Sequence, residues 1–415
     1  MILGTQRAAR VVTQALRAAC CIVGAVYLLC PASCSFPGAV RPTVKIGLVA
    51  PFEGCYRAIG YDVIYAARLA LREVNEAGGV GGYAVELVAY DDGAQSALAV
   101  EQAHKLDVDP DVLAAIGHFR EDTTRAAAAA YCQAGLPLLA PAVLDPHLTR
   151  DQGALYRLGP PAPVLAAALL ERAAQLVGTS PGRLREAGEI ALVGQDGPLG
   201  ASLQDLAREK EGDEASWRLT TVSADAADWQ TGVLALDPAV ILCDLDPVGA
   251  GEVVAALRQE GWSGEVLGGP ALAAKDFVAV AGESAQGVTF VTPWPFPLDV
   301  PGGDAFTADY RAISDGVEPG PLALPTYEGT WMLLAALEKA ALSAEPTRRG
   351  VSAALWTVER EGVLGHVAFD EEHSWSGESL YWYRIGPAGV PRLAETTRRV
   401  GVASLTDSAS CPENR

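Results

Sequence analysis

Between residues 44 and 92 the apolar positions change from one periodicity to another, and this change predicts a strand, a helix and a second strand. Residues 44–49 form a short apolar run, which is typical of a buried strand. Apolar residues then recur at the spacing of a helix, at Ile64, Ala67, Leu71 and Val74. Gly78 and Gly79 can adopt the positive φ that ends a helix, and residues 83–90 return as a β-rich segment. The stretch therefore predicts one βαβ unit.

A βαβ unit predicts a parallel sheet, and such a sheet indicates where a ligand binds. In open parallel sheets small molecules bind beyond the carboxyl ends of the strands. The first such place in this chain is the loop 51–60, which contains Tyr56. We expect Tyr56 to be either a wall of a ligand site or an aromatic residue on the surface.

The same alternation continues along the chain in two series. The predicted elements are helix 96–105, strand 112–116, helix 123–133 and strand 136–139, and then helix 163–176, strand 189–193, helix 201–209, strand 239–242, helix 251–259 and strand 265–267. The loops 117–122 and 140–145 lie at the same sheet edge as the first loop. Because 415 residues are too many for one ordinary core, we expect two α/β domains, each a doubly wound three-layer unit.

The alternation breaks at residues 291–303, where the sequence VTPWPFPLDVPGG contains four prolines and two glycines. This density excludes a regular helix or strand over the whole segment. We interpret the segment as a connection between the domains, in which Trp294 either packs on a ligand or wedges the hinge. Helices are predicted to follow at 305–314 and 326–344.

The last part of the chain is predicted to be β-rich. Residues 366–369 and 380–385 are interpreted as a hairpin around the acidic turn 370–372, and residues 398–415 as a disordered tail. The turn and the following His373 have the residue types of a metal site, but a solvated turn is the simpler interpretation, and no metal site is predicted.

The first 33 residues resemble a secretory signal peptide. Three arginines precede the apolar stretch 18–29, which is shorter than the ~20 residues that a spanning helix needs. Cys34 follows two small residues, as in a bacterial lipobox, although Pro31 stands where an aliphatic residue is usual. The alternatives are lipidation of Cys34, ordinary cleavage and an uncleaved anchor. In each case we expect the protein to work outside the cytoplasm of a bacterium, secreted or anchored as a lipoprotein.

The formal net charge of −20 argues against nucleic acid as a partner, because phosphate binding needs clustered Lys and Arg. Four cysteines remain if Cys34 is lipidated: Cys55, Cys132, Cys243 and Cys411. Their wide spacing excludes a zinc knuckle. Export permits disulfides, but we expect buried free thiols at Cys132 and Cys243.

Motifs of catalysis are not found in the sequence. It contains no GxSxG elbow, no P-loop glycine-lysine string and no HExxH helix, and its five histidines are scattered. The pair Asp91 and Asp92 follows a strand and precedes a helix, where carboxylates commonly act as caps. We therefore expect neither an enzyme nor a cofactor.

Several local strings resemble the type I periplasmic binding proteins, the leucine/isoleucine/valine-binding family that serves ABC importers. These strings are KIGLVAPFEG, VNEAGGVGG, VAYDD, AAIGH, AGLPLLAPAVLDPHLT and LRQEGWSGEVLGG. The resemblance covers about residues 43–395. It implies two lobes joined by three crossovers, with a cleft between them that closes on a ligand. Lobe one would comprise 43–157 and 293–375, and lobe two 158–292 and 376–397.

The resemblance also implies which loops contact the ligand. Family members that bind amino acids use a hydroxyl-rich loop matching 120–124, a small-residue loop matching 142–144, an acid near Pro161 and another acid in the string matching 268–272. This chain departs from the pattern at most of these places. Acids replace hydroxyls at Glu121 and Asp122, Leu144 lacks a hydroxyl, and two prolines replace the acids.

These departures predict a neutral or cationic ligand, such as an amide, an amine or an aromatic compound, because an acid pair repels a carboxylate. The ligand-binding candidates come from loops after strands of both lobes. They are Tyr56, Arg120, Glu121, Asp122, Ala142, Val143, Leu144, Asp196, Asp246 and Pro270. For the acids the alternatives are a cap on the helix that opens at Thr123 and, at Asp196 and Asp246, ordinary turn chemistry.

The sequence thus predicts an extracytoplasmic solute-binding protein that delivers a small polar molecule, an amino acid, amide or amine, to the membrane subunits of an ABC permease. The first alternative is an extracellular sensing module that presents its closed state to a receptor. The second alternative is an enzyme.

Overall fold

The computed structural model describes residues 41–398 except 152, 179–187, 195–196, 211–215, 376 and 378. The predicted signal peptide with Cys34, the candidate Asp196, and all but the first residue of the predicted tail 398–415 lie outside the described residues. Among the described residues, no helix is both long enough and apolar enough to span a bilayer.

The first sheet has six strands, all parallel, in the order β13-β5-β4-β3-β1-β2. Its strands are β1 (Thr43–Ala50), β2 (Ala84–Asp91), β3 (Val112–Gly117), β4 (Leu138–Ala140), β5 (Leu155–Leu158) and β13 (Ser374–Trp375). The chain reverses its direction of winding between β1 and β3, so the carboxyl ends of these two strands flank the crevice where such sheets bind ligands.

The second sheet has seven strands in the order β15-β14-β10-β9-β8-β6-β7. Its strands are β6 (Gly188–Gly194), β7 (Trp217–Ser223), β8 (Val240–Asp244), β9 (Glu265–Gly268), β10 (Thr289–Thr292), β14 (Ser379–Ile385) and β15 (Pro391–Arg398). The strands from β7 to β10 in this order are parallel, and β14 and β15 join as an antiparallel edge. The core of this sheet repeats the winding of the first.

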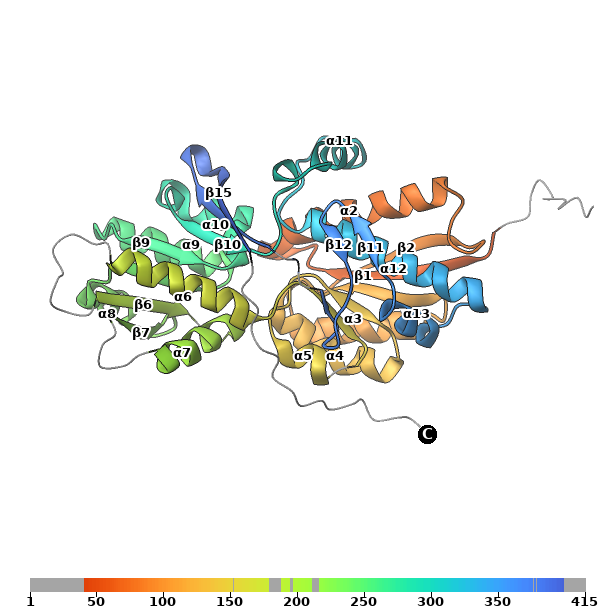
Figure 1. The fold of residues 1–415 in the computed structure, drawn as a ribbon, viewed down its shortest axis with the longest axis horizontal. Helices are drawn as coiled ribbons and strands as arrows, with labels where there is room; N and C mark the ends of the chain where they lie inside the picture. The colour runs from red at the N-terminus through yellow and green to blue at the C-terminus, as the bar shows by residue number, and fades with distance from the viewer. Residues whose placement is uncertain are drawn as a thin grey trace, which may run out of the picture. The chain divides into compact units, whose positions relative to one another are not determined.

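Helices cover both faces of each sheet (Figure 1). The helices of the first sheet are α2 (Arg57–Glu76), α3 (Ser96–Asp107), α4 (Glu121–Ala134), α5 (Pro146–Asp151), α11 (Gly303–Ile313), α12 (Ala323–Ser343) and α13 (Arg348–Leu355). The helices of the second are α6 (Ala162–Gly178), α7 (Pro198–Lys210), α8 (Trp229–Leu236), α9 (Pro247–Gln259) and α10 (Lys275–Ala281). Short 3₁₀ turns are η1 (Gly54–Tyr56), η2 (Pro270–Ala273), η3 (Gly282–Ala285), η4 (Pro297–Asp299) and η5 (Pro387–Gly389).

Burial explains why the strands of the first sheet read as continuous apolar runs. On β1 the side chains of Ile46 and Leu48 pack with α2, α12 and α13, whereas Val49 packs with α3 and α4 on the opposite face. A strand covered on both faces has no solvated side to mark with polar residues. The α/β prediction, with two three-layer lobes, is confirmed.

The chain passes between the two sheets three times: after β5, after β10 and after β13. The second passage begins in the proline-rich segment that was interpreted as a connection. The exact lobe boundaries stay a prediction. Gly78 and Gly79 have φ angles of 116° and 82°, as expected for the residues that end α2.

The hairpin predicted for the last part of the chain is wrong. Residues 365–367 form β12 (Gly365–Val367), which pairs with β11 (Arg360–Gly362), whereas β14 pairs with β10 and β15. The two segments joined in the prediction thus belong to different sheets. Local alternation of apolar residues identified strands, but their partners lie far away in the sequence.

Candidate functional site

A cavity of ≈ 180 Å³ lies where the carboxyl ends of the strands of both sheets meet. The first sheet contributes residues from the start of α2 and from the loops after β3 and β4, the second contributes residues after β9, and the crossover after β10 completes the wall. The lining residues are Ala58, Ile59, Asp62, Phe119, Ala142, Leu144, Pro270, Ala271, Ala274, Lys275, Asp276, Thr292, Trp294, Gly320, Pro321 and Leu322.

The wall of this cavity is mostly apolar. Phe119 and Trp294 are only 3% and 4% exposed, and aliphatic side chains such as Leu144 and Leu322 line the remainder. Such a lining stabilises a ligand with an apolar body, because about 25 cal/mol is gained for each Å² of apolar surface removed from water.

Asp62 is one of three charged side chains in the wall, and it is already bonded to the protein. Its carboxylate accepts hydrogen bonds from the backbone N–H groups of Gly320 (2.6 Å) and Leu322 (2.9 Å). Burial raises the pKa of Asp62 to about 6, against the effect of these bonds. A Cβ at position 320 would lie 2.7 Å from Asp62 Oδ2, so a side chain there would have to displace the carboxylate. Asp62 thus fixes the chain segment that leads into α12.

The other two charged side chains come from the first turn of α10. Lys275 is exposed and donates to the backbone carbonyl of Glu318 at 3.2 Å. Asp276 is partly buried, and its Oδ2 has no hydrogen-bond partner in the part of the chain that the structure describes. Burial raises the pKa of Asp276, and the charge of Arg57 opposes this shift.

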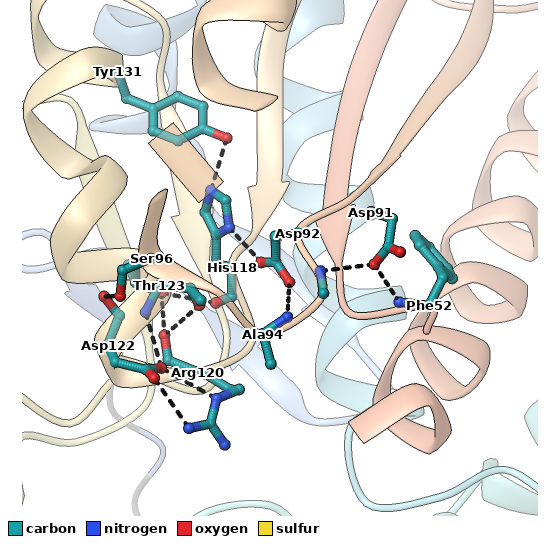
Figure 2. Close-up of polar contacts among 12 residues, drawn as sticks. Phe52, Asp91, Asp92, Ala94, Ser96, His118, Arg120, Asp122, Thr123 and Tyr131 are labelled. Atoms are coloured by element: carbon teal, nitrogen blue, oxygen red, sulfur yellow. Dashed lines mark hydrogen bonds and ion pairs between the residues drawn. The ribbon is translucent and has the colours of Figure 1, made fainter. Parts of the chain in front are cut away.

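The loop after β3 is built on a buried network of polar side chains, which Figure 2 shows. His118 Nδ1 lies 2.7 Å from Asp92 Oδ2, and Tyr131 OH lies 3.2 Å from His118 Nε2. All three side chains are buried. The hydroxyl of Thr124 donates to the carbonyl of His118 at 3.0 Å. The network holds the loop against α4 and places Phe119, the next residue, in the cavity wall.

Arg120 and Asp122 pair with each other at the start of α4 (Figure 2). The guanidinium donates from Nε and Nη2 to the two carboxylate oxygens, both at 3.1 Å, and its Cζ lies 4.1 Å from the centre of the Tyr56 ring. Burial raises the pKa of Tyr56 to about 12, and Asp246 contributes to this increase despite the opposing charge of Arg120. Tyr56, Arg120 and Asp246 therefore form a group that is distinct from the cavity wall.

Glu121 shapes the loop after β4. Its Oε2 accepts a hydrogen bond from the N–H of Leu144 at 3.0 Å, and the side chain is 23% exposed. Burial raises the pKa of Glu121 to about 7, and the charge of Asp145 adds to the shift, whereas Arg125 opposes it. The N–H of Leu144 is thus occupied by an acid of the protein itself.

A family model described as periplasmic binding protein matches residues 43–389. The chain belongs to that family. The resemblance found in the sequence is confirmed. Leu/Ile/Val-binding protein homolog 2 of Brucella abortus is 24% identical over 364 residues, which cover 83% of this chain and 92% of that protein.

Two solved structures show the same fold. The branched-chain amino acid transporter substrate binding protein LivJ of Streptococcus pneumoniae, in complex with isoleucine, has a TM-score of 0.74 and 23% identity, and the match covers 86% of this chain and 99% of that chain. A solute binding protein of an ABC transporter from R. palustris, in complex with benzoate, has a TM-score of 0.71 and 16% identity, with 86% and 97% covered.

The structure of this periplasmic binding protein brings some of the predicted site residues to the cavity and places others elsewhere. Ala142, Leu144 and Pro270 line the cavity, whereas the remaining described candidates do not. Those remaining candidates are Tyr56, Arg120, Glu121, Asp122, Val143 and Asp246. Asp196 lies outside the described residues. Contact of these residues with a ligand stays a prediction.

The structure shows how the candidate acids Asp246, Glu121 and Asp122 relate to the helix caps that were the alternative to ligand binding. Asp246 caps α9, because its Oδ1 accepts from the N–H groups of Val248 (2.9 Å) and Gly249 (3.2 Å). At α4 the N-cap residue is Arg120, so Glu121 and Asp122 occupy the first turn rather than the cap. Helix opening at Thr123 is therefore corrected to Glu121.

Sequence reasoning overlooked Ile59, Asp62, Phe119, Asp276 and Leu322 as cavity residues. Ile59 and Phe119 lie within loops that the topology had selected, but polar neighbours were preferred there. A rule that includes the apolar residues of these loops would have found them. Asp62 and Asp276 lie on helices, and no local pattern distinguishes them from surface acids.

One expectation about the cysteines is wrong. Cys132 is disulfide-bonded, whereas Cys55 is free and exposed and Cys243 is free and buried. Within the described chain no three His, Cys, Asp or Glu side chains gather as a metal site. Asp370 instead accepts from the N–H groups of Glu372 and Ser374, which builds a turn.

Proposed function

We propose that this periplasmic binding protein binds a small solute in the cavity and delivers it to the membrane subunits of an ABC importer, without chemistry of its own. The observation that carries the proposal is the origin of the cavity wall, which is formed by residues after strands of both sheets and by the crossover after β10. A ligand in this place contacts both lobes, so its binding energy favours the closed arrangement over the open one.

The solute we propose has an apolar body and is neutral or cationic. Names of relatives point to leucine, isoleucine and valine, and one solved neighbour holds isoleucine while another holds benzoate. In this chain, however, the N–H of Leu144 is already bonded to Glu121, so it is not available to a ligand carboxylate. Two of the three charged side chains in the cavity wall, Asp62 and Asp276, are acids, and this further disfavours an anion.

We further propose that the protein acts outside the cytoplasm, with a lipid on Cys34 holding it at the membrane. The family name supports the extracytoplasmic location. Mass spectrometry of the protein extracted from membranes tests the anchor: an acylated N-terminal Cys34 is expected, and an unmodified N-terminus at another residue would contradict it.

A thermal-shift screen of the purified protein tests the binding function. The compounds are amino acids, amides, amines, polyamines and aromatic acids at near-neutral pH. A ligand that binds only the native state raises Tm, and 100-fold excess over Kd stabilises by about 2.7 kcal/mol. Stabilisation by leucine and not by amides or amines would overturn the proposed ligand class. If no compound of any class shifts Tm or gives heat in calorimetry, solute binding at this cavity is refuted.

Uptake of the labelled ligand by the producing cell tests delivery. Deleting the gene for this chain is expected to abolish high-affinity uptake, since the importer then receives no loaded binding protein. Unchanged uptake together with a lost transcriptional response to the ligand would favour the sensing alternative.

A further inference from the structure

Arg157 is a fully buried charge that lies close to the cavity without lining it. Its side chain has no exposed surface, and it is not one of the residues of the cavity wall. Burial lowers the pKa of Arg157 to about 10, and the charges of acids such as Asp370 and Glu121 oppose this shift. A buried charge destabilises a fold unless hydrogen bonds satisfy it. The partners of Arg157 therefore indicate which parts of the chain it holds together.

The guanidinium of Arg157 donates to three segments that are separate in the sequence. Its Nε donates to the carbonyl of Gly159 at 3.1 Å, and its Nη1 donates to the carbonyl of Asp145 at 3.0 Å. Its Nη2 donates to the hydroxyl of Ser374. All three acceptors are uncharged oxygen atoms. The planar guanidinium presents its donors in a fixed fork, so one side chain can fix three segments in one geometry.

Two of these segments are passages of the chain between the sheets. Gly159 begins the first passage, directly after β5, and Ser374 opens β13, after which the chain passes for the third time. Ser374 also lies opposite Arg157 in the parallel pairing of β13 with β5. The second passage packs against the first, because a Cβ at position 159 would lie 3.0 Å from Cζ2 of Trp294. Arg157 thus joins the first and third passages where the second is in contact with them.

The third segment belongs to the wall of the cavity. Asp145 ends the loop after β4, in which Ala142 and Leu144 line the cavity. The carbonyl of Leu144 also accepts the N–H of Ala162 at 2.8 Å, at the start of α6 and beyond the first passage. A solute that contacts this loop therefore contacts a segment that is bonded directly to the connections between the lobes.

From these bonds we infer that Arg157 is a positioning residue for solute binding, which holds the wall loop 142–145 in a fixed orientation to the first and third passages. The inference rests on the proposed solute-binding function and adds how the cavity wall is coupled to the connections between the lobes. Because Arg157 does not line the cavity, its loss changes the fraction of molecules that can bind rather than the contacts of one ligand. Apparent affinity falls by that fraction, which is the same for every solute.

The variant Ser374→Ala tests the inference, because it removes one acceptor and leaves the charge of Arg157 in place. Calorimetry with leucine, isopentylamine and 4-methylpentanamide is the measurement. For each probe that binds the unmodified protein, affinity is expected to fall by one common factor of about threefold to tenfold. Unchanged affinity overturns the inference, since Arg157 would then only stabilise the fold. A factor that differs between the probes also overturns it, since this would indicate direct contact with the solute.

Thr330→Val is the matched control for a loss of stability alone. It removes a buried hydroxyl from α12 of the first sheet, one that donates to the carbonyl of Thr326. Both variants are expected to lower Tm, because each loses a buried hydrogen bond, but only Ser374→Ala is expected to lower affinity. Arg157→Lys, which keeps the charge and loses the fork, is the second variant and should weaken binding by at least as large a factor.

Small-angle X-ray scattering of the ligand-free protein gives a measurement that depends on no ligand. Ser374→Ala and Arg157→Lys are expected to have a larger radius of gyration than the unmodified protein and Thr330→Val, because looser connections favour open arrangements of the lobes. Scattering curves that coincide for all four proteins refute the inference. If no compound of the thermal-shift screen binds while the scattering differs as expected, the solute-binding function fails and the role of Arg157 at the connections stands.

Discussion

At the scale of single residues, two acids near the cavity bind the protein's own backbone. Glu121 and Asp62 both bind backbone N–H groups of distant loops, at Leu144 and at Gly320 and Leu322. The sequence identified Glu121 as special because it replaces a hydroxyl of the family pattern. It did not reveal the bond to Leu144, because a contact between residues 23 positions apart depends on how β3 and β4 are paired.

Glu121 is expected to make the protein less stable as the pH rises. Its folded-state pKa of about 7 lies above the usual value of 4.5, so its neutral form is favoured by folding. Its contribution is complete below about pH 4.5 and is lost as the pH rises through 7. Glu121→Gln is expected to reduce the loss of Tm between pH 5 and pH 8, with an effect of at most about 3 kcal/mol.

Thermal melts across this pH range measure the effect of Glu121→Gln. Glu252→Gln, at an exposed position, serves as the control and should follow the unmodified protein. A pH profile of Glu121→Gln that coincides with that of the unmodified protein would show that Glu121 titrates normally.

At the scale of elements, the sequence predicted most of the helices and strands with a consistent apolar pattern, and it missed long elements such as β7 and β15 as well as short ones. The helix α2 and the strand β1 follow from residues 44–76 alone, because many apolar positions agree there. The strands β5 and β13 have four and two residues, too few for any periodicity to show. Their pairing within the sheet, and not their own sequence, defines them.

The segment that leads into α12 depends on Asp62 of α2. Asp62→Ala is expected to release Gly320 and Leu322, because their N–H groups lose their acceptor while the surrounding fold remains. Hydrogen exchange of the peptide containing both residues should become at least about tenfold faster, which corresponds to ~1.4 kcal/mol. Asp309→Ala on the neighbouring α11 is exposed and should leave the exchange unchanged. Equal exchange in both variants would mean that the segment is held by other contacts.

At the scale of the whole molecule, the alternation of strands and helices predicted the class, and the family strings supplied the crossovers. No residue-level pattern indicates that the chain returns twice to a sheet it has left, since the composition of a loop does not indicate which sheet the next strand joins. The cavity could be predicted only as a set of loops. Which side chains of those loops reach it depends on the arrangement of both sheets, and that information is absent from any single segment.

A hydrogen bond from Lys275 to the carbonyl of Glu318 joins helix α10 of the second sheet to the segment before α12. Because Lys275 and residues 320–322 of this segment both line the cavity, Lys275→Met is expected to weaken solute binding about threefold to tenfold, the range of a single exposed hydrogen bond. Calorimetry measures the change. Lys339→Met is the control, since Lys339 bonds Thr357 within the first lobe. Equal affinities of Lys275→Met and the unmodified protein would contradict a role in closure.

The three cysteines of the described chain differ in their environments and therefore in their reactivity towards thiol reagents. Cys132 is disulfide-bonded and has no free thiol. Burial raises the pKa of the Cys243 thiol to about 12, so it is not a thiolate at neutral pH. Cys55 is exposed and precedes α2, whose first turns line the cavity. A maleimide dye attached to Cys55 would sit beside the cavity, so its fluorescence offers an optical test of solute binding.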